Sequence, residues 1–536
     1  MKKSALYLLV TVLIAILALT SFSFTGEGTN KASNSYEDLI TLFKEWREFQ
    51  KPKVIDGVPD YTAAAMEKQY QGLKELQKRL AAIDTSSYSL SQKVDYHLVR
   101  AEMNGLEFDH RVLRPWSRDP AFYVVINFQF GPKMHGAMRI PRGPLSPDQI
   151  EGFKKKLEAV SKILEQAKTN LTEGTDDLAM LGIRSKEREM GILKNLILRL
   201  EEDHPGLIPS AQKALAAVVD FRDWLKANKS RMTAPSGIGV EDYNWHMKNV
   251  RLMPLTWEEI LLISEREYER AFASMKLEEH RNRNRPPLNV VETEEEFLKL
   301  YNSSQAFLLD FLKNEEILTV PDYMVLRPVR SFRKQAVRDY FRHIQIRDPL
   351  PLMPHDFVGH GPDAIRHRRD KRPIRGESRL YFIDGIRAEA LATGAEELLM
   401  HAGLLDERPR SRELTYNLLA FRAARSIADL KMHSNELTLK EAFDYCIETT
   451  PKRWSPPESP TLWHDLELYL RQPGYGTGYL IGSVMLKKLL ADRAVQQGDK
   501  FELRQFMDEF LAAGMIPLSL IRWEMTGLED QIKKLW

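Results

Sequence analysis

The chain has 536 residues, of which 43% are hydrophobic and 28% are charged. These proportions are typical of a globular protein with a large core, so they exclude a wholly disordered chain. The 77 basic and 75 acidic residues nearly cancel, so net charge gives no attraction to nucleic acid or to anionic membranes. The single cysteine, Cys446, excludes an intramolecular disulfide and a metal cluster held by cysteines.

The first residues have the order of a secretory signal. Lys2 and Lys3 precede an apolar run, residues 5–19, and small and polar residues follow it. The run is shorter than the ~20 residues that a membrane span needs, and no cysteine follows it that could carry a lipid. We predict a signal peptide or an uncleaved N-terminal anchor at 1–24 and a flexible tether at 25–35. An exported protein, periplasmic or extracellular, with no further membrane domain is expected.

The spacing of apolar residues beyond the tether is mostly helical. Residues 36–106 repeat apolar side chains at three- and four-residue steps, as amphipathic helices do. Ser146 followed by Pro147 predicts the start of a further helix. Amphipathic helices then continue to about Asn228.

A stretch with proline and glycine, 233–239, is the clearest break in this pattern. It divides an N-terminal helical region, 36–232, from a C-terminal helical region, 233–536. Beyond it, the order of Thr256 and the acids after it predicts a capped helix that runs to about Met275.

Two short segments carry the β-type pattern. Residues 122–130 form a strand or a buried loop, and 322–329 read as a strand with a proline near its end. Three prolines within 347–354 prevent a regular helix there. Helices dominate from that point, with breaks at 453–459 and 473–474. The predicted fold is therefore mainly α with a small β element.

Ionisable side chains concentrate in one segment of the C-terminal region. His355, Asp356, His360, Asp363 and His367 fall within a stretch of thirteen residues, although the whole chain has only 13 histidines. Imidazoles and carboxylates that converge are the usual protein ligands of zinc. The segment therefore predicts a divalent metal site.

Two arrangements of this segment are open. On a continuous helix, Asp356, His360, Asp363 and His367 would step by four, three and four and share one face. The glycines and the proline between them favour instead a loop and then a helix that begins near Pro362, with the first two histidines converging from the loop. Asp363 and His367 also have structural interpretations. Asp363 would be a first-turn acid that complements the helix dipole, and His367 would belong to a solvated basic face.

Several ordered segments resemble a bacterial protein family. The segments are Gly239–Trp245, Thr256–Glu259, Leu380–Gly385, Leu418–His433, Tyr469–Gly482 and Phe501–Arg504. They are similar to the family called "domain of unknown function 885" from about Gly237 to Trp523, with a weaker match back to about Ser35. The resemblance implies one continuous domain over about 36–530. It also implies a large multi-helix, zincin-like fold of the thimet-oligopeptidase kind.

The family usually carries H-E-x-x-P-G-H-H, and a later E-G-W segment is thought to give a third acidic ligand. Here the segment reads His-Asp-Phe-Val-Gly-His from 355 to 360. If His355 matches the first histidine, one residue is missing and Asp356 replaces the glutamate. If Gly-His matches without a gap, Pro354 replaces the first histidine and His355 replaces the glutamate. Asp384 stands at the later acidic position.

The resemblance implies roles for these residues. His355, His360 and Asp384 would bind a divalent metal, with zinc as the first candidate, and Asp356 would be the general base. Glu389 is a substitute ligand or base if its helix turns it inward.

Three residues further along the chain complete the set of candidates. Tyr479 matches a family tyrosine and is a candidate donor to a developing oxyanion, or alternatively a packed helix residue. Arg425 and His433 share one long helix and are supporting candidates, although Arg425 and Asp429 also form a structural i,i+4 pair.

Three functions follow from these residues. The first is an exported metal-dependent hydrolase that cleaves peptide or amide bonds. The second is a different metal-assisted reaction on the same scaffold, and the third is a degenerate family member that binds a peptide or small molecule.

Replacement of glutamate by aspartate shortens the reach of the base by one methylene, and a displacement of about 1 Å can cost roughly a hundredfold in rate.

Overall fold

The structure is a computed structural model that describes residues 35–128, 131–327 and 339–536. The predicted signal or anchor and all of the predicted tether except Ser35 lie outside the described residues. Within the described residues the fold is mainly helical, as predicted. None of the helices in this part of the chain is both long and apolar enough to cross a membrane.

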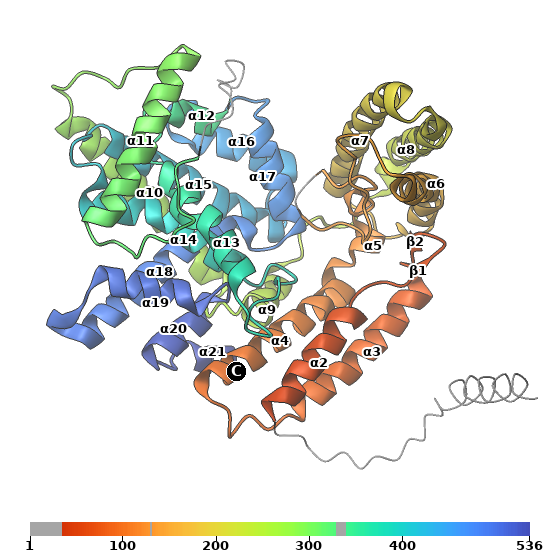
Figure 1. The fold of residues 1–536 in the computed structure, drawn as a ribbon, viewed down its shortest axis with the longest axis horizontal. Coiled ribbons are helices and arrows are strands. Elements are labelled where there is room, and N and C mark those ends of the chain that lie inside the picture. Colours follow the sequence, from red (N-terminus) through yellow and green to blue (C-terminus); the bar gives the residue numbers. More distant parts are fainter. Residues whose placement is uncertain (1–34, 129–130, 328–338) are drawn as a thin grey trace, which may run out of the picture.

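The predicted helical stretch 36–106 folds into three helices that lie side by side (Figure 1). They are α2 (Tyr36–Phe49), α3 (Ala63–Ala81) and α4 (Leu90–Phe108). Each begins after a serine or threonine whose side chain accepts a backbone N–H of the first turn. Their apolar faces join the same hydrophobic cluster as helices near the C-terminus.

The β structure is small and lies elsewhere than predicted. Two antiparallel strands, β1 (Val54–Ile55) and β2 (Val58–Pro59), form a hairpin between α2 and α3. The described part of 322–329, up to Arg327, contains a turn and no strand; the last two residues of that segment lie outside the described residues.

The apolar segment that begins at Phe122 is a buried loop, the second of its two predicted forms. The backbone N–H groups of Val125 and Ile126 both donate to the carboxylate of Glu189, at 2.7 and 2.9 Å. Glu189 is fully buried and pairs with Lys186. The carboxylate accepts N–H groups that would otherwise donate to a neighbouring strand. Up to Phe128, where the described part of this segment ends, it forms only one isolated bridge, from Ile126 to Met138.

A second group of helices forms a bundle beside the rest of the molecule (Figure 1). It contains α6 (Pro147–Asn170), α7 (Asp176–Asp203) and α8 (Ile208–Asn228). The predicted start at Ser146 is confirmed by a capping box with Gln149. The bundle has its own hydrophobic cluster, which draws its residues from Tyr61 to Met232.

The remaining chain forms a large helical body that holds the candidate site. Its helices follow a short α5 (Pro115–Arg118) and are α9 (Val240–Asn249), α10 (Trp257–Arg281), α11 (Glu294–Asn314), α12 (Tyr340–Gln345), α13 (Gly361–Arg369), α14 (Gly385–Leu399), α15 (Ser411–His433), α16 (Leu439–Thr449), α17 (Pro460–Arg471), α18 (Tyr475–Gln497), α19 (Leu503–Ala513), α20 (Leu518–Thr526) and α21 (Ile532–Leu535). The predicted breaks at 233–239, 453–459 and 473–474 all separate helices. The helix after Thr256 has the predicted cap but runs six residues beyond Met275.

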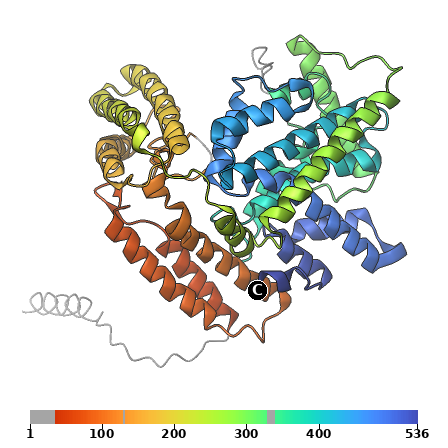
Figure 2. The ribbon, with the colours of Figure 1, turned by 180° about the vertical axis from the view of Figure 1, so that it is seen from behind.

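Helix α15 is the centre of this body. Nearly all of its residues from Leu414 to His433 are buried, including several charged ones. The long helix α10 packs along it on the outer side (Figure 2), and α14 and α18 lie beside each other next to it. Gly482 permits the close approach of α18 to α14, because a Cβ there would lie 2.7 Å from the carbonyl oxygen of Ile386.

The segment His355–His360 forms neither a loop nor a continuous α-helix. It is a π-helical turn, here called η6, that leads directly into α13 at Gly361. Gly359 leaves the helical range, at φ −78° and ψ −107°. A Cβ on Gly359 would lie 2.7 Å from Cα of Ala392 on α14. Glycine therefore sets how closely η6 packs against α14.

We expect Gly359→Ala to lower the free energy of unfolding by about 1–3 kcal/mol, because the added methyl group overlaps the α14 backbone. The shift of the denaturation midpoint in urea measures this. Gly191→Ala is the matched control: Gly191 is an exposed residue of α7 with open space around it, so alanine should be neutral or stabilising by up to about 1 kcal/mol. Equal midpoints for the two variants would contradict the close packing.

Candidate metal centre

Three side chains from two elements converge at one point. His355 and His360 come from η6 and Glu389 from α14, and one ligand atom from each lies within 4.8 Å of the other two. The Oε2 atom of Glu389 is 3.8 Å from Nε2 of His355 and 3.6 Å from Nε2 of His360. Two imidazoles and a carboxylate are the ligand set of many catalytic zinc sites.

The π-helical turn brings the two histidines together. They are five residues apart, and in an α-helix of 3.6 residues per turn that spacing puts side chains on different faces. A π turn closes one residue later than an α turn, so residues five apart return to the same face. The two imidazole rings accordingly lie 4.8 Å apart, edge to face.

The three residues fit a metal ion in spacing and in hydrogen bonding. Tetrahedral ligation with bonds of ~2.0–2.2 Å places ligand atoms roughly 3.4 Å apart, and the two histidine–carboxylate distances are within about half an ångström of that. Oε2 of Glu389 is buried and has no hydrogen-bond partner among the described residues. A buried carboxylate oxygen without a partner is costly, and a cation between it and the imidazoles would remove that cost.

A second carboxylate orients His355 from behind. Oε1 of Glu396 lies 3.0 Å from Nδ1 of His355, and Arg422 donates to both oxygens of Glu396, at 2.5 and 2.6 Å. Nη2 of Arg422 also lies 3.4 Å from this Nδ1 atom. A proton on Nδ1, shared with Glu396, would leave the lone pair of Nε2 facing the centre. Carboxylate–histidine pairs of this kind raise the basicity of zinc-bound histidines.

The charges at the centre shift the pKa values of its own residues. Burial alone would lower the pKa of His360, but the neighbouring Glu389 carboxylate outweighs burial and raises it. Burial alone would raise the pKa of Glu389, but the charge of His360 and the nearby positive charges lower it. The imidazole and the carboxylate therefore each favour the charged form of the other.

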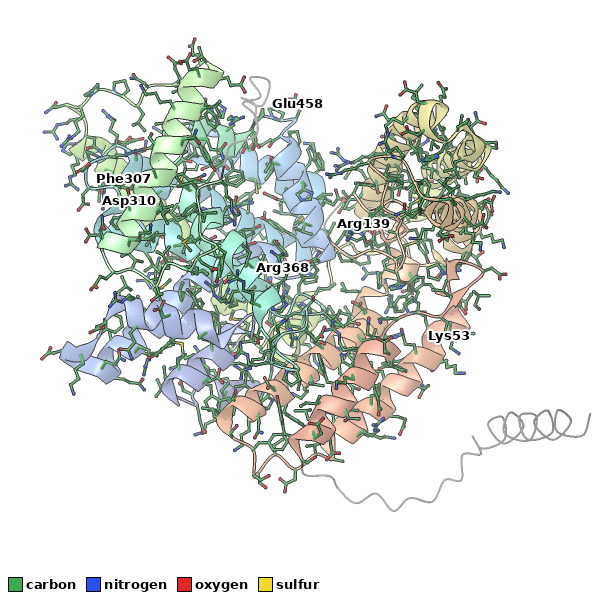
Figure 3. The ribbon with its side chains drawn as sticks, in the orientation of Figure 1. Lys53, Arg139, Phe307, Asp310, Arg368 and Glu458 are labelled. Carbon is green, nitrogen blue, oxygen red and sulfur yellow. The ribbon has the colours of Figure 1, made fainter. Side chains whose placement is uncertain are left out.

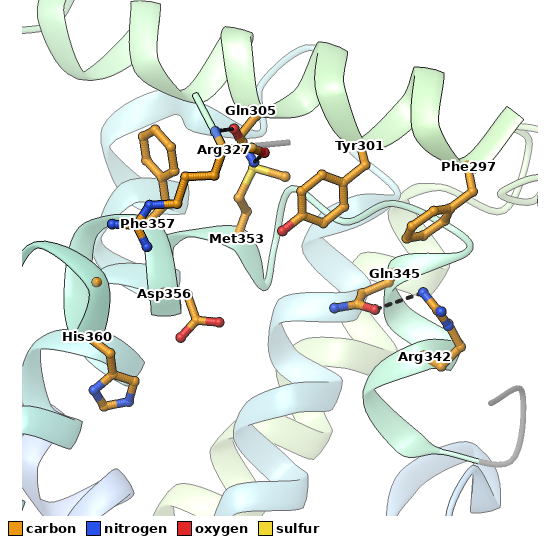
Figure 4. A pocket seen from close by; sticks show the side chains of 11 residues that line it. Phe297, Tyr301, Gln305, Arg327, Arg342, Gln345, Met353, Asp356, Phe357 and His360 are labelled. Atoms are coloured by element: carbon orange, nitrogen blue, oxygen red, sulfur yellow. Dashed lines mark hydrogen bonds between the residues drawn. The ribbon is translucent and has the colours of Figure 1, made fainter. Parts of the chain in front are cut away.

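Two cavities meet at this centre. The larger has a volume of about 580 Å³ and is lined by His360, Tyr301 and Phe297, among others; the smaller has about 290 Å³ and is lined by His355 and Tyr479, among others. Figure 4 shows the larger one, with side chains from α11, α12 and η6 around it. A substrate therefore has room on both sides of the two histidines.

Asp356 lines both cavities and is exposed. Figure 4 shows its side chain between His360 and Tyr301, and Asp356 is close enough to Tyr301 to help raise the pKa of that phenol. It is also close enough to His360 to help raise the pKa of that imidazole. The predicted general base therefore stands beside the metal centre and in contact with solvent.

Two tyrosines of α18 lie beside Glu389 and the smaller cavity. Tyr475 donates a hydrogen bond to Oε1 of Glu389 at 3.3 Å, which leaves the other oxygen, Oε2, facing the histidines. Tyr479, one turn further, lines the smaller cavity, and the guanidinium of Arg425 lies 5.0 Å from its ring centre. Tyr479 thus borders the same cavity as His355, and its role as an oxyanion donor stays a prediction.

The predicted third ligand, Asp384, does not join the centre, and the structure places Glu389 there instead. Asp384 precedes the first turn of α14, and its charged neighbours are Arg379 and Arg251. The face of α14 that meets η6 is the one that carries Glu389 and, two turns later, Glu396. Asp384 is about 1.4 turns away from Glu389, so it points elsewhere.

Asp363 and His367, the alternative ligands on α13, are also directed away from the centre. Asp363 is buried and forms ion pairs with Arg366 and Arg387. His367 has Asp370 and Asp384 as its charged neighbours. The basic end of α13 is partly solvated, with Arg368 exposed (Figure 3). Because the π turn ends before α13 begins, the side chain of His360 faces a different direction from the side chains of Asp363 and His367.

The supporting residues of α15 divide between two places. Arg425 lines the smaller cavity but pairs with Asp465 of α17, not with Asp429, so the predicted i,i+4 pair is wrong. His433 is not one of the three converging residues. Its Nε2 is 3.1 Å from the carbonyl oxygen of Tyr469. Burial lowers the pKa of His433 to about 4, so the ring is neutral and structural at neutral pH.

Sequence reasoning missed Glu396 and Tyr475 as parts of the site. The spacing of Glu389 and Glu396 was the available signal, because acids seven residues apart lie on one face of a helix. That face is otherwise apolar or small, which makes two buried acids conspicuous. Nothing in the sequence marks Tyr475, because its role depends on how α18 packs against α14.

The comparison with protein families gives one match. The sequence matches the family described as "Bacterial protein of unknown function (DUF885)" over residues 50–319 and 392–525, about three quarters of the chain. The chain belongs to this family. The matched stretches contain Glu396, Arg422 and both tyrosines of α18, whereas η6 and Glu389 lie in the stretch between them.

Solved structures share the fold. One is described as "a putative lipoprotein of unknown function" from Shewanella oneidensis; it is 15% identical, with a TM-score of 0.70, over 92% of this chain and 100% of that one. Another, "the putative lipoprotein from Colwellia psychrerythraea", is 14% identical, with a TM-score of 0.66, over 91% of this chain and 98% of that one. No curated protein sequence matches the chain.

We expect Glu396→Gln to weaken zinc binding by about 10- to 100-fold, because an amide orients and polarises His355 less well than a carboxylate does. Titration calorimetry with zinc, after removal of metal by a chelator, measures the change. Glu448→Gln, at an exposed glutamate of α16, is the control and should bind as the wild type does. Unchanged affinity in Glu396→Gln would show that this carboxylate does not support the ligand.

Proposed function

We propose that the protein is a metal-dependent hydrolase of peptide or amide bonds, with zinc as the first candidate for the metal. The convergence of His355, His360 and Glu389 at the junction of two cavities is the observation that carries the proposal. Three protein ligands leave a fourth position open, as in catalytic zinc sites and unlike closed structural ones.

A residue for each step of hydrolysis is available beside the candidate centre. A bound zinc ion would lower the pKa of water to about 7 and polarise a carbonyl group. In this proposal Asp356 accepts a proton from the attacking water, whose hydroxide adds to the carbonyl carbon. Tyr479 donates to the oxygen on which negative charge develops. Asp356 then gives the proton to the nitrogen as the carbon–nitrogen bond breaks, so one water yields an acid and an amine.

Other features support a hydrolase that acts on small substrates. The cavities combine aromatic and polar walls, as sites for peptides and small molecules do. The helical body, with its histidines and acids facing a cleft, is consistent with the zincin-like fold that the family resemblance implies. The nearly balanced charge favours such a substrate over nucleic acid.

We further propose that the protein is exported, to the periplasm or outside the cell, with its N-terminal segment cleaved or kept as a tether. The basic and apolar order of the first residues supports this. Two proteins of the same fold are described as putative lipoproteins, which agrees with a location outside the cytoplasm.

Metal analysis of the purified protein beside His360→Ala tests the centre. We expect about one zinc per chain in the wild type and none in the variant, because one of three ligands is lost. His135→Ala, at an exposed histidine, should keep its metal. A wild type that binds no stoichiometric metal after incubation with zinc, manganese or cobalt would overturn the proposal and favour a family member that only binds a ligand.

The second test is turnover on a library of peptides and amides, with and without chelator. We expect Asp356→Asn to lower kcat by roughly 10²- to 10⁴-fold, the usual contribution of a general base, while the metal content stays unchanged. Asp310→Asn, at an exposed acid of α11, should leave kcat unchanged. Bound metal without turnover on any amide would favour a different metal-assisted reaction on the same residues.

A further inference from the structure

One arginine near the candidate centre has two guanidinium nitrogens, with three of its five N–H donors, that make no hydrogen bond to the described residues. Arg425 is almost fully buried, yet it lines the smaller cavity. Its Nη1 pairs with Asp465, whereas Nε and Nη2 have no hydrogen-bond partner among the described residues. A buried donor without a partner is costly, and here two occur on one guanidinium.

The two free donors lie on the same edge of the guanidinium. Nε–H and one N–H of Nη2 point in parallel and form the fork that binds both oxygens of a carboxylate. Rings cover the rest of the group: the centres of the rings of Phe421 and Tyr479 lie 4.3 and 5.0 Å from its central carbon. Asp465, which also lines this cavity, holds Nη1, so Nε and Nη2 are the donors that remain for a ligand.

The position of this fork relative to the metal centre restricts the ligand. Arg422, three residues earlier on α15, reaches within 3.4 Å of Nδ1 of His355, and three residues advance a helix by about 4.5 Å. Both arginines and His355 line the smaller cavity, so the fork belongs to the same cavity as a residue of the centre. A peptide carbonyl at the centre would have the end of its chain near Arg425 if only one or two residues followed it.

We infer that Arg425 binds the C-terminal carboxylate of the substrate, so that the protein removes one or two residues from the carboxyl end of short peptides. This rests on the proposed hydrolase function. The larger cavity, past His360, would hold the acyl side of the scissile bond, and the smaller cavity would hold the leaving residues. Water gives its hydroxide to the carbonyl carbon and a proton to the leaving amine, so no other reactant is needed.

Binding to the metal-depleted wild type tests the carboxylate site without turnover. The probes are N-acetyl-phenylalanine, its carboxamide, and an N-acetyl-glutamate whose α-carboxyl group is capped as the amide, measured by titration calorimetry. We expect the free α-carboxylate to bind at least about tenfold tighter than either capped compound, because a charged hydrogen-bonded pair contributes about 1.5–3 kcal/mol. Equal binding of the carboxamide, or of the side-chain carboxylate, would overturn the inference.

Variants locate the effect on the fork. Arg425→Lys keeps the charge that balances Asp465 but has no bidentate edge, so it should lose most of the preference for carboxylate over carboxamide. Arg412→Lys is the control on the same helix, where Arg412 pairs with Glu278 of α10 instead. A full preference in Arg425→Lys would also overturn the inference. The wild-type comparison stands even if this variant folds poorly.

Turnover by the metal-loaded wild type separates the two proposals. We expect peptides with a free carboxyl end to be cleaved within two residues of that end, and their C-terminal amides to be at least about tenfold poorer in kcat/KM. Cleavage of both at equal rates would retain the hydrolase and overturn the carboxylate site. A carboxylate preference in binding without any metal or turnover would retain the carboxylate site and overturn the hydrolase.

Discussion

The close packing of η6 against α14 is the constraint on which the site depends. Gly359 lets the π turn approach the backbone of α14 at Ala392, and this approach puts Glu389 opposite the two histidines. The same approach carries His355 onto Glu396, two turns along α14. If η6 moved outward by the width of one methyl group, both contacts would lengthen together, because one rigid helix supplies both carboxylates.

The second feature of the site is the amount of charge it buries. Glu389, Glu396 and Arg422 are each at most 6% exposed at their side chains, and taking such groups out of water costs several kcal/mol per ion before pairing returns any of it. A well-packed apolar replacement is often at least as stable. We therefore interpret the Glu396–Arg422 pair as fixing the orientation of His355 rather than as stabilising the fold. Buried, hydrogen-bonded groups hold a ligand more rigidly than exposed ones do.

Much of the fold could be predicted from the sequence, because caps and breaks are local. Ser146 and Thr256 start helices through their own side chains, and the break at 473–474 contains the residues that end one helix and begin another. The choice between a strand and a buried loop for the apolar segment that begins at Phe122 depended on a distant partner. A buried glutamate on α7 takes the place of a neighbouring strand, and no local pattern shows that.

The site was predictable in place but not in composition. His355 and His360 stand out by residue type and proximity, and the structure brings both together with Glu389. The third donor depends on which face of α14 meets η6, and this follows from packing rather than from the position of an acid in a motif. Asp384 keeps the motif position, whereas Glu389 lies on the contacting face. Arg425 was paired with Asp429 by spacing alone, because the approach of α17 could not be known.

The backbone of η6 explains how the two histidines of this segment come together. His355 and His360 are five residues apart. In an α-helix this spacing would put their side chains on different faces, whereas the π turn puts them on the same face. Both alignments with the family pattern stay open, because η6 lies in the stretch between the residues that match the family. In the alignment that would make Asp356 the base, its carboxylate lies where the two cavities adjoin. A glutamate there would carry its carboxylate one methylene further, and a base must come within about 2.6–3.2 Å of the proton it accepts. The length of this side chain therefore decides whether it can reach a water molecule at the centre.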